Sequence, residues 1–431
     1  MRRIQKYSIK LTAELKQRLL SWAQQFEEVV WLDSNDYEQT HGSFSAILAV
    51  DAFTAVKTDY SNAFASLDEY QQKTNDWLFG YLTYDLKNAV ENLESKNLDG
   101  LDFPDLYFFQ PKKVFLFSED EVTMQYLNMV DDELESDWQE ISNFKTSEIS
   151  QPEPETIKIR LRTSKDSYFE KVNEMLRHIC RGDIYEANFC QEFFSKDVKI
   201  NPLKSYLHLN EISKPPFATF LKFDKHYALC ASPERYLKKT GSRVVSQPIK
   251  GTAKRLDNPS EDKKMIEMLS QDPKERSENI MITDLVRNDL SKIAEKGSVK
   301  VDELCKISSF EQVHQMISTI SCRVSSEVSP VEIIRNSFPM GSMTGAPKIS
   351  AMKIIEELED AKRGLYSGAM GYFTPNGDFD FNVIIRSILY NEAAKYVSYS
   401  VGGAITAKSI PENEYEECLI KAKAMREVLE S

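Results

Sequence analysis

The segment between residues 164 and 182 carries the clearest helical pattern in the chain. Ser164 and Ser167 are residue types that begin helices, and Gly182 is one that ends them. Between these signals, apolar residues recur every three or four positions and so fall on one helix face: Tyr168, Val172, Met175, Leu176 and Ile179. The pattern predicts an amphipathic helix over this segment.

Short apolar runs separated by turn residues predict antiparallel strands in the second half of the chain. The turn Thr240-Gly241-Ser242 lies between residues 235–239 and 243–249, a spacing typical of a β-hairpin. Three further strands are predicted over residues 367–373, 379–390 and 396–405, and helices near residues 261–293, 346–361 and 411–430. Separate groups of antiparallel strands and helices indicate the α+β class rather than a doubly wound parallel sheet.

A polar tract, Thr146 to Glu155, divides the chain. It includes Pro152 and Pro154, and Ile149 is its single large apolar residue, a composition typical of a linker. We therefore expect an N-terminal lobe over residues 1–150 and a second region over residues 160–431.

Composition and charge narrow the class of protein. The chain has 431 residues, 41% hydrophobic and 28% charged, which excludes a disordered or fibrous protein. Its 54 lysines and arginines stand against 67 acidic residues, a net charge of −13, so general binding to nucleic acid or to an anionic membrane is not expected. No apolar run approaches the ~20 residues that cross a bilayer, and the first residues do not resemble a secretion signal. We expect a cytoplasmic protein.

The six cysteines show no pattern typical of disulfide or zinc chemistry. None belongs to a CxxC pair, so we expect buried, reduced thiols. A metal ion, if the protein uses one, would then be held by carboxylates.

Arg386 occupies an apolar position of a predicted strand. Its neighbours two residues away are Ile384 and Ile388, and a strand repeats its faces every two residues. A guanidinium among apolar side chains requires an anion, which is either an internal aspartate or glutamate or the anionic group of a ligand.

Two pairs of glutamates lie three residues apart at predicted helix starts. Glu414 and Glu417 lie with Lys421 at the edge of the apolar stripe of the C-terminal helix, and Glu275 and Glu278 lie at the front of another helix. Each pair alone fits solvated acids, which favour a first helical turn. Together the four carboxylates could hold one Mg²⁺ ion, which prefers oxygen ligands.

Lys250 ends a predicted strand between Ile249 and Gly251. A desolvated lysine there could act as a nucleophile, although a surface lysine with a buried stem is the more common outcome. Two glycine-containing segments, residues 341–348 and 401–404, match neither a P-loop nor a dinucleotide fingerprint. Both could present backbone N–H groups to a carboxylate.

Taken in order, these segments resemble the chorismate-utilising enzyme family, which comprises anthranilate, aminodeoxychorismate, isochorismate and salicylate synthases. The resemblance covers residues 165–430, whereas the first 150 residues match only loosely. Its motifs are Gly182-Asp183-Ile184-Tyr185-Glu186-Ala187-Asn188, Ser232-Pro233-Glu234-Arg235, Pro248-Ile249-Lys250-Gly251-Thr252, Glu275 to Asp289, His314, Gly345-Ala346-Pro347-Lys348, Ile385-Arg386, Gly402-Gly403 and Glu414-Tyr415-Glu416-Glu417. It implies a fold of large antiparallel β-sheets packed as a sandwich with flanking helices.

The resemblance also implies a reaction. Lysine at position 250, where anthranilate synthases carry alanine, is similar to component I of the aminodeoxychorismate synthases. Such an enzyme replaces the 4-hydroxyl of chorismate with an amino group on the route to 4-aminobenzoate and folate. The ammonia would come from a separate glutaminase subunit, because this chain carries no convincing glutaminase signature. The N-terminal lobe would be a region for a partner or a structural ligand.

Binding roles follow from the resemblance. It assigns Mg²⁺ to four carboxylates: Glu275, Glu278, Glu414 and Glu417. It assigns the substrate to a set of polar and glycine residues: Gly402, Gly403 and Lys421 for the ring carboxylate, Arg386 and Tyr366 for the enolpyruvyl carboxylate, and Ser342 for a hydroxyl. Thr344 is expected in the same segment as a helix cap.

The resemblance implies three catalytic residues. Glu234 would be the general acid for the departing hydroxyl, which requires burial to raise its pKa. Lys250 would add as a neutral amine at ring carbon 2, and ammonia would then attack carbon 4 and displace it. His314 is included without a defined role.

Two positions depart from the family pattern. Glu186 stands where the isochorismate and salicylate branches carry a lysine that activates water, so addition of water is not expected; aminodeoxychorismate synthases more often have glutamine there. Ala404 replaces a common glycine. Two alternatives stay open: an anthranilate synthase component I, and a catalytically silent subunit that only binds a glutaminase.

Overall fold

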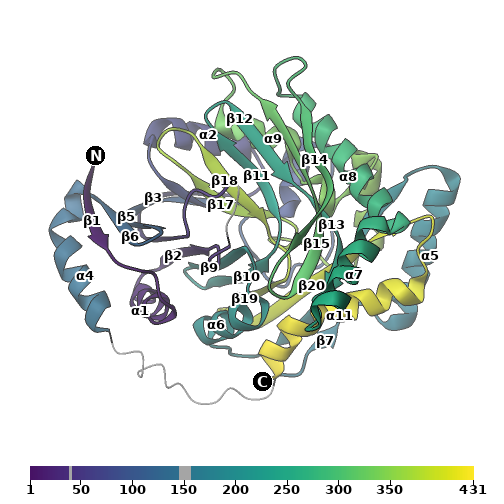
Figure 1. The fold of residues 1–431 in the computed structure, drawn as a ribbon, viewed down its shortest axis with the longest axis horizontal. Helices are drawn as coiled ribbons and strands as arrows, with labels where there is room; N and C mark the ends of the chain where they lie inside the picture. The colour runs from purple at the N-terminus through teal and green to yellow at the C-terminus, as the bar shows by residue number, and fades with distance from the viewer. Residues whose placement is uncertain (38–40, 145–156) are drawn as a thin grey trace.

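The structure, a computed structural model, describes residues 1–37, 41–144 and 157–431. The predicted linker, Thr146 to Glu155, lies outside these residues. The described chain forms twenty strands in one connected network, with helices around it (Figure 1). All pairings between named strands are antiparallel. The α+β prediction is confirmed.

Two sheet arms diverge from β5, which pairs with β3, β4 and β6. The N-terminal strands are β1 (Arg2–Ser8), β2 (Glu28–Asp33), β3 (Ala46–Thr58), β4 (Leu78–Leu82), β5 (Leu106–Ser118) and β6 (Glu121–Leu127). The first arm continues from β3 through β2, β9 (Phe217–Phe223), β10 (His226–Ser232), β19 (Ser387–Asn391), β20 (Tyr396–Thr406) and β8 (Glu186–Lys196), with β7 (Arg160–Leu161) and β16 (Gly345–Ala346) beside β8.

The second arm begins with β4. It continues through β17 (Ala369–Phe373), β18 (Phe379–Val383), β11 (Arg235–Thr240), β12 (Arg243–Gln247) and β15 (Val313–Arg323), and β15 also pairs with β13 (Ile249–Lys254) and β14 (Lys300–Ser309). Strands from before residue 145 therefore pair with strands from after residue 156 in both arms, β2 with β9 and β4 with β17.

The two arms face each other across a buried apolar layer. Val30 and Leu221 of the first arm share this layer with Phe79 and Met370 of the second. The outer face of the first arm is covered by α1 (Ala13–Ala23), α4 (Leu134–Asn143), α5 (Lys165–Arg181), α6 (Pro202–Ser213), α10 (Lys348–Leu358) and α11 (Pro411–Glu430). The outer face of the second is covered by α2 (Ala63–Thr74), α8 (Pro273–Ser291) and α9 (Pro330–Ser337). This arrangement confirms the predicted sandwich with flanking helices.

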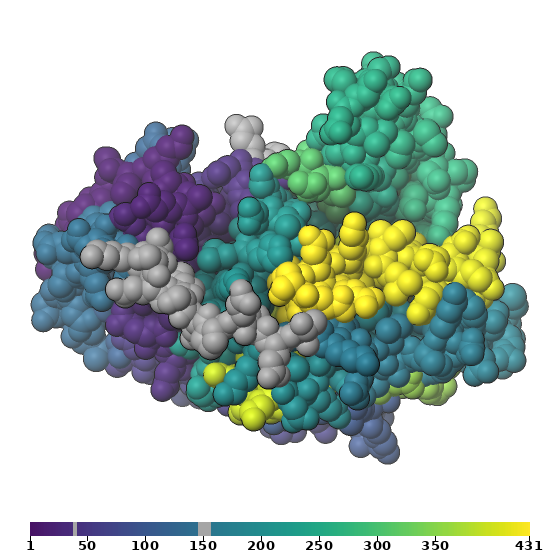
Figure 2. All heavy atoms as spheres, turned by 90° about the horizontal axis from the view of Figure 1, so that it is seen from below, coloured from purple at the N-terminus to yellow at the C-terminus, as the bar shows by residue number. Residues whose placement is uncertain are grey.

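The remaining helices are short or peripheral: α3 (Lys87–Val90) and α7 (Pro259–Gln271). Figure 2 shows α11 lying along the lower face of the molecule, next to the segment that contains α5. In the described part of the chain, no helix combines the length and apolar character needed to cross a membrane. The six cysteines are free thiols; five are buried, and Cys180 is exposed, contrary to the expectation for that residue.

Local signals placed several elements correctly. The hydroxyl of Ser164 accepts the backbone N–H of Ser167 at the start of α5, and Gly182 ends this helix with a left-handed φ of 85°. Strands β11 and β12 form the predicted hairpin, and α11 begins at the predicted Pro411.

The predicted strand over residues 379–390 is two strands. β18 pairs with β11 and β17 of the second arm, whereas β19 pairs with β10 and β20 of the first. The chain therefore crosses between the arms at residues 384–386, and Arg386 has a left-handed φ of 54°. The prediction of a continuous strand with Ile384, Arg386 and Ile388 on one face is wrong, because the chain changes sheets there.

The predicted helix over residues 261–293 is likewise two helices, α7 and α8. They are separated at Asp272, whose carboxylate accepts the N–H groups of Lys274 and Glu275 at 2.8 and 3.0 Å. Pro273 occupies the first turn of α8. An aspartate cap followed by proline is a favourable helix start, so this sequence begins a new helix and fixes the position of Glu275.

Candidate active site

Lys250 lies at a bulge in the second arm, facing the first arm. The register of β13 against β15 shifts between Ile249 and Thr252, and Gly251 has a φ of 87°. A bulge of this kind re-aims a side chain out of the regular pleat. The Lys250 side chain is 11% exposed, and its Nζ lies 3.2 Å from Oε1 of Glu186, the first residue of β8.

The electrostatic surroundings keep Lys250 charged in the resting protein. Burial alone would lower the pKa of Lys250, but the negative charges of Glu186 and Glu278 more than offset burial and raise this pKa. The amine must therefore lose a proton before it can act as a nucleophile.

Glu234 lies beside Lys250 and is 3% exposed. Burial raises the pKa of Glu234 to about 7, although the Ser342 hydroxyl, the positive charge of Lys250 and the N–H of Ile249 oppose this rise. A carboxylic acid with this pKa still holds its proton in a large part of the molecules at neutral pH. Glu234 can therefore donate a proton to a leaving group.

The two glutamate pairs come together from α8 and α11. The ammonium of Lys274 lies between them, with Nζ 3.2 Å from Oε1 of Glu414 and 3.9 Å from Oε1 of Glu278. Burial raises the pKa of Glu275, and the negative charge of Glu417 adds to this effect. Acidic side chains that were predicted to share one cation are thus neighbours.

Buried carboxylate oxygens in this cluster lack donors. Within the described residues, Oε1 of Glu278 and Oε2 of Glu414 have no hydrogen-bond partner. A Cβ on Gly403 would come within 3.3 Å of Oε2 of Glu414, so the glycine lets β20 approach this oxygen closely. Burial raises the pKa of Glu278 to about 7, and the nearby charges of Lys250 and Lys274 only partly oppose this rise.

The donor set is chemically suited to Mg²⁺, because it offers several carboxylate oxygens that need a cation. No three acidic, histidine or cysteine side chains of the described residues converge into a ready metal cluster. Glu417 already has a cation at 2.5 Å, Lys421, which outweighs burial and lowers the pKa of Glu417. Magnesium binding by the four glutamates stays a prediction.

Arg386 is a cation without a carboxylate partner in the described part of the chain. Its Nη1 donates only a long bond, 3.4 Å, to the carbonyl of Lys421. Burial lowers the pKa of Arg386, and the charges of Tyr366 and Glu417 are near enough to oppose this effect. Arg386 also lines a cavity of about 200 Å³. An internal ion pair, one of the two possibilities left by the sequence, is not formed with any residue that the structure describes.

The other predicted substrate contacts lie around the same region. Lys421 donates to the carbonyl of Gly402 at 2.8 Å as well as to Glu417. The hydroxyl of buried Tyr366 lies 3.5 Å from the sulfur of Cys190. Their roles toward a substrate stay predictions.

In the described residues, no hydrogen bond or ion pair joins Thr344 or His314 to another predicted site residue. The Thr344 hydroxyl donates to the carbonyl of Gly341 at 3.1 Å, and α10 begins after Pro347 without a side-chain cap, so the predicted cap is wrong. His314 is fully buried, and its ring nitrogens lie 2.8 Å from Ser309 and 2.8 Å from Asp262. Its membership of the catalytic group stays a prediction.

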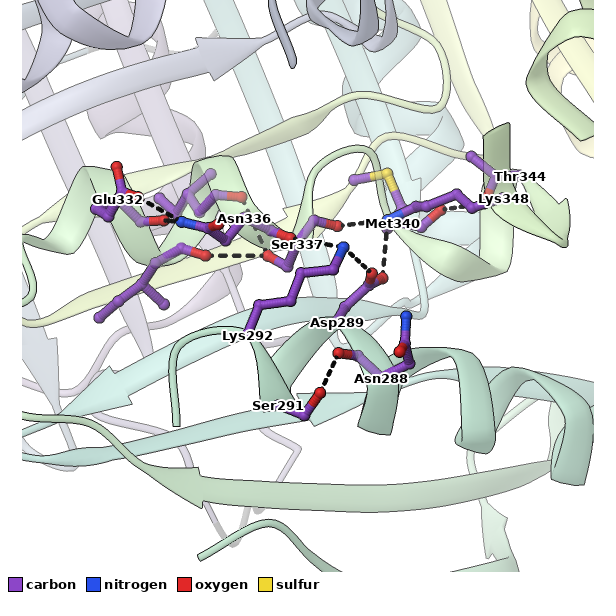
Figure 3. Close-up of polar contacts among 12 residues, drawn as sticks. Asn288, Asp289, Ser291, Lys292, Glu332, Asn336, Ser337, Met340, Thr344 and Lys348 are labelled. Carbon is purple, nitrogen blue, oxygen red and sulfur yellow. Dashed lines mark hydrogen bonds and ion pairs between the residues drawn. The ribbon is translucent and has the colours of Figure 1, made fainter. Parts of the chain in front are cut away.

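A buried ion pair supports the segment that carries Ser342 (Figure 3). Lys348 donates to Asp289 of α8 at 2.8 Å and to the carbonyl of Ser337 at 2.9 Å, and Lys292 donates to the other oxygen of Asp289 at 3.1 Å. These contacts tie α8 to the connection between α9 and α10. Asp289 and Lys348, which belong to two of the family motifs, therefore have a structural role: they hold the segment that carries Ser342 against α8.

Sequence reasoning missed two contacts that define the site. Lys274 was not among the predicted site residues, and Glu186 was noted only as a departure from the family pattern. No sequence signal marked Glu186 as buried; the structure places it at the start of a strand in which all but the last residue are buried. An acid at such a position requires a cation.

Comparison with known proteins decides the family. Residues 27–427 match the model of the chorismate binding enzyme family. The chain belongs to this family. The match also extends through much of the N-terminal lobe, where the motifs were weakest.

Family members among curated proteins carry two kinds of name. A Synechocystis protein called anthranilate synthase component I-like is 34% identical over 86% of this chain and 76% of its own length. Aminodeoxychorismate synthase component 1 of Bacillus subtilis is 32% identical over 81% of this chain and 76% of its own. The chloroplastic aminodeoxychorismate synthase of Arabidopsis thaliana is 42% identical over 61% of this chain, which spans only 28% of that longer protein.

Solved structures of the family share the fold. Anthranilate synthase component I of Streptococcus pneumoniae superimposes with a TM-score of 0.78 at 24% identity, covering 90% of this chain and 93% of that one. The menaquinone-specific isochorismate synthase of Escherichia coli does so with 0.77 at 15% identity, covering 100% and 95%. At these identities the likeness establishes the architecture.

Proposed function

We propose that this chain is the large subunit of an aminodeoxychorismate synthase, which replaces the 4-hydroxyl of chorismate with ammonia. The observation that carries the proposal is the position of Lys250. Its amine is buried beside a carboxyl group, Glu234, whose pKa is raised to about 7. Displacing a hydroxyl requires a nucleophile that attacks the ring and an acid that protonates the leaving group, and Lys250 and Glu234 can supply both. Relatives named aminodeoxychorismate synthase agree with this assignment.

The proposed binding of chorismate uses Arg386 and the four glutamates, some of whose carboxylate oxygens accept no hydrogen bond in the described chain. Arg386, which lacks a carboxylate partner in the described chain, would receive the enolpyruvyl carboxylate through charge-assisted hydrogen bonds, next to Tyr366. A magnesium ion held by Glu275, Glu278, Glu414 and Glu417 would supply the positive charge that the ring carboxylate needs. Gly402, Gly403 and Lys421 would orient this carboxylate, and Ser342, which already bonds Glu234, would lie near the hydroxyl.

The chemistry then proceeds in two displacements. The neutral amine of Lys250 adds to ring carbon 2 while Glu234 protonates the departing 4-hydroxyl. Ammonia next attacks carbon 4, and the lysine leaves. Splitting one difficult step into two, through a covalent intermediate, is the usual gain of nucleophilic catalysis.

Product identification tests the proposal. The chain is incubated with chorismate, Mg²⁺ and ammonium chloride, with and without a separate aminodeoxychorismate lyase. We expect an aromatic product, 4-aminobenzoate, only when the lyase is present. Lys250→Ala should abolish the aminated product, whereas Lys254→Ala, on an exposed residue of the same strand, should retain it. Normal amination by Lys250→Ala would contradict the covalent route.

Anthranilate synthase is the second candidate. The 34% identical Synechocystis relative carries an anthranilate synthase component I-like name. The same incubation separates the two activities, because anthranilate is fluorescent and forms without any lyase. Strong fluorescence before addition of the lyase would favour this candidate.

The source of ammonia and the compartment are part of the proposal. The component 1 names of relatives support a second subunit, which we propose to be a glutaminase, and the free cysteines are compatible with a cytoplasmic protein. Activity with glutamine should then require the partner, while activity with ammonium chloride should not.

A further inference from the structure

Glu186 contacts the proposed nucleophile, and the mechanism above gives it no task. It is 1% exposed, and one of its oxygens lies 3.2 Å from Nζ of Lys250. Its other oxygen, Oε2, has no hydrogen-bond partner in the described part of the chain. An unpaired oxygen on a buried carboxylate costs folding free energy, so its presence calls for an explanation such as a catalytic role.

The position of Glu186 is fixed by backbone pairing. Glu186 pairs with Thr406 of β20 and with Ala346 of β16. Gly345 packs against the Glu186 carbonyl so closely that a Cβ would lie 2.1 Å from this oxygen. Strands on both sides therefore hold the carboxylate toward Lys250, as a catalytic group requires.

Three other carboxylates face Lys250 from neighbouring elements: Glu278 of α8, Glu417 of α11 and Glu234 before β11. None of the three lies within 4 Å of the amine as an ion pair in the described chain, whereas Glu186 does. Glu278 and Glu417 are the predicted metal ligands. Glu234 must keep its proton for the leaving hydroxyl. Glu186 is thus the carboxylate free to accept a proton from Lys250.

We propose that Glu186 is the base that deprotonates Lys250, a proposal that rests on the amination function above. The Glu186 carboxylate takes one proton from the Lys250 ammonium. The freed lone pair forms the bond to ring carbon 2, the two conjugated ring double bonds each shift by one position, and the carbon 4–oxygen bond breaks. Glu234 gives its proton to the departing oxygen, which leaves as water.

The second displacement restores both carboxyl groups. Ammonia forms a bond to carbon 4, both ring double bonds shift back, and the carbon 2–nitrogen electrons return to Lys250. The neutral lysine retakes its proton from Glu186, and the new ammonium group on carbon 4 returns a proton to Glu234. One hydroxyl is exchanged for one amino group, with water as the other product, and no external base is consumed.

The test compares Glu186→Gln with Glu186→Asp in the full chain. Glutamine keeps the size and hydrogen bonding of the side chain but cannot accept a proton, whereas aspartate can. The first measurement is acetylation of Lys250 by acetic anhydride from pH 6 to 10, read by peptide mass spectrometry. The second is the amination rate with ammonium chloride over the same pH range. Thermal unfolding shows whether each variant is folded.

We expect the two measurements to move in opposite directions in Glu186→Gln. Acetylation of Lys250 should begin at lower pH, because the amine loses its nearest anion. Amination at pH 7 should fall about 100-fold or more, the usual size of general-base catalysis, and should recover as pH rises because solvent must take the proton. Glu186→Asp should lose less activity and keep the wild-type pH profile.

Two results would overturn the proposal. If Glu186 only holds Lys250 in its charged form, acetylation and amination should both increase in Glu186→Gln. If amination is unchanged at pH 7, Glu186 has no catalytic role. Failure of the amination function itself is distinguishable, because wild-type protein would then give no aminated product, while the acetylation profiles would still report the contact between Glu186 and Lys250.

Discussion

Replacing Glu234 with glutamine should make the protein more stable at alkaline pH while removing its activity. The wild-type carboxyl is buried, and its pKa is about 7 in the folded chain instead of the ordinary 4.5. Below pH 4.5 the proton is bound in both folded and unfolded chains. Between pH 4.5 and 7 only the unfolded chain loses it, so the folded state loses stability as pH rises. Glutamine has no proton to lose and avoids this cost.

The magnitude follows from the two pKa values. A pKa of about 7 rather than 4.5 corresponds to about 3 kcal/mol of unfolding free energy, lost in full above pH 7. Between pH 5.5 and 8.5 the change amounts to about 2 kcal/mol, because part of the loss has already occurred at pH 5.5. The unfolding free energy of Glu234→Gln minus that of wild type should rise by this amount over the interval.

Urea unfolding at pH 5.5 and 8.5, in the presence of EDTA, measures this difference. Every other titrating group is common to the two proteins and cancels. Glu416→Gln, which neutralises an exposed glutamate on α11, supplies the baseline for removing a charge without burial. If the unfolding free energy of Glu234→Gln minus that of wild type is the same at the two pH values, Glu234 is not a buried proton donor. Its role as general acid would then be refuted.

Three further outcomes are expected. Arg386→Met should weaken chorismate binding about 10- to 100-fold in calorimetry, because a hydrogen bond to a charged group is worth about 1.5–3 kcal/mol. Arg287→Met, on the exposed side of α8, should leave binding unchanged. Glu414→Gln should reduce the rise in melting temperature that Mg²⁺ produces, and Glu416→Gln should preserve it. Gly80→Ala should destabilise the fold by about 3 kcal/mol or more in urea unfolding, since its Cβ would lie 2.0 Å from a backbone oxygen of β5.

Helix ends and the side chains that share a helix face could be predicted, because residues close in the sequence determine them. The ends of α5 were fixed by Ser164 and Gly182, whose caps form as expected. The two glutamate pairs were visible because residues three apart lie on one side of a helix. Local signals could not give the partner of each element. That α8 and α11 meet was suggested by the chemistry of the four carboxylates and implied by the resemblance.

Features set by long-range pairing could not be predicted. Residues 379–390 have continuous strand character, but their two halves pair with different arms, and Arg386 takes the left-handed conformation at the crossing. The contact between Lys250 and Glu186 has the same origin, because it joins a bulge of one arm to the first residue of a strand in the other. The residues flanking Lys250 and those flanking Glu186 give no indication that the two side chains meet.

The charge of the site argues for a divalent cation independently of the family. Lys250 faces the carboxylates of Glu186 and Glu278, and within the described residues Glu414 is paired only with Lys274, whose side chain is about one-third exposed. Chorismate would bring two more negative charges to this region, and in a partly buried site like charges repel strongly. Arg386 can neutralise one carboxylate; the other has no unpaired cation among the described site residues. Binding of chorismate should therefore require added divalent cation and should be lost in EDTA. Tight binding in EDTA would contradict this prediction and would mean that the ammonium of Lys274 moves away from the glutamates and neutralises the substrate carboxylate instead.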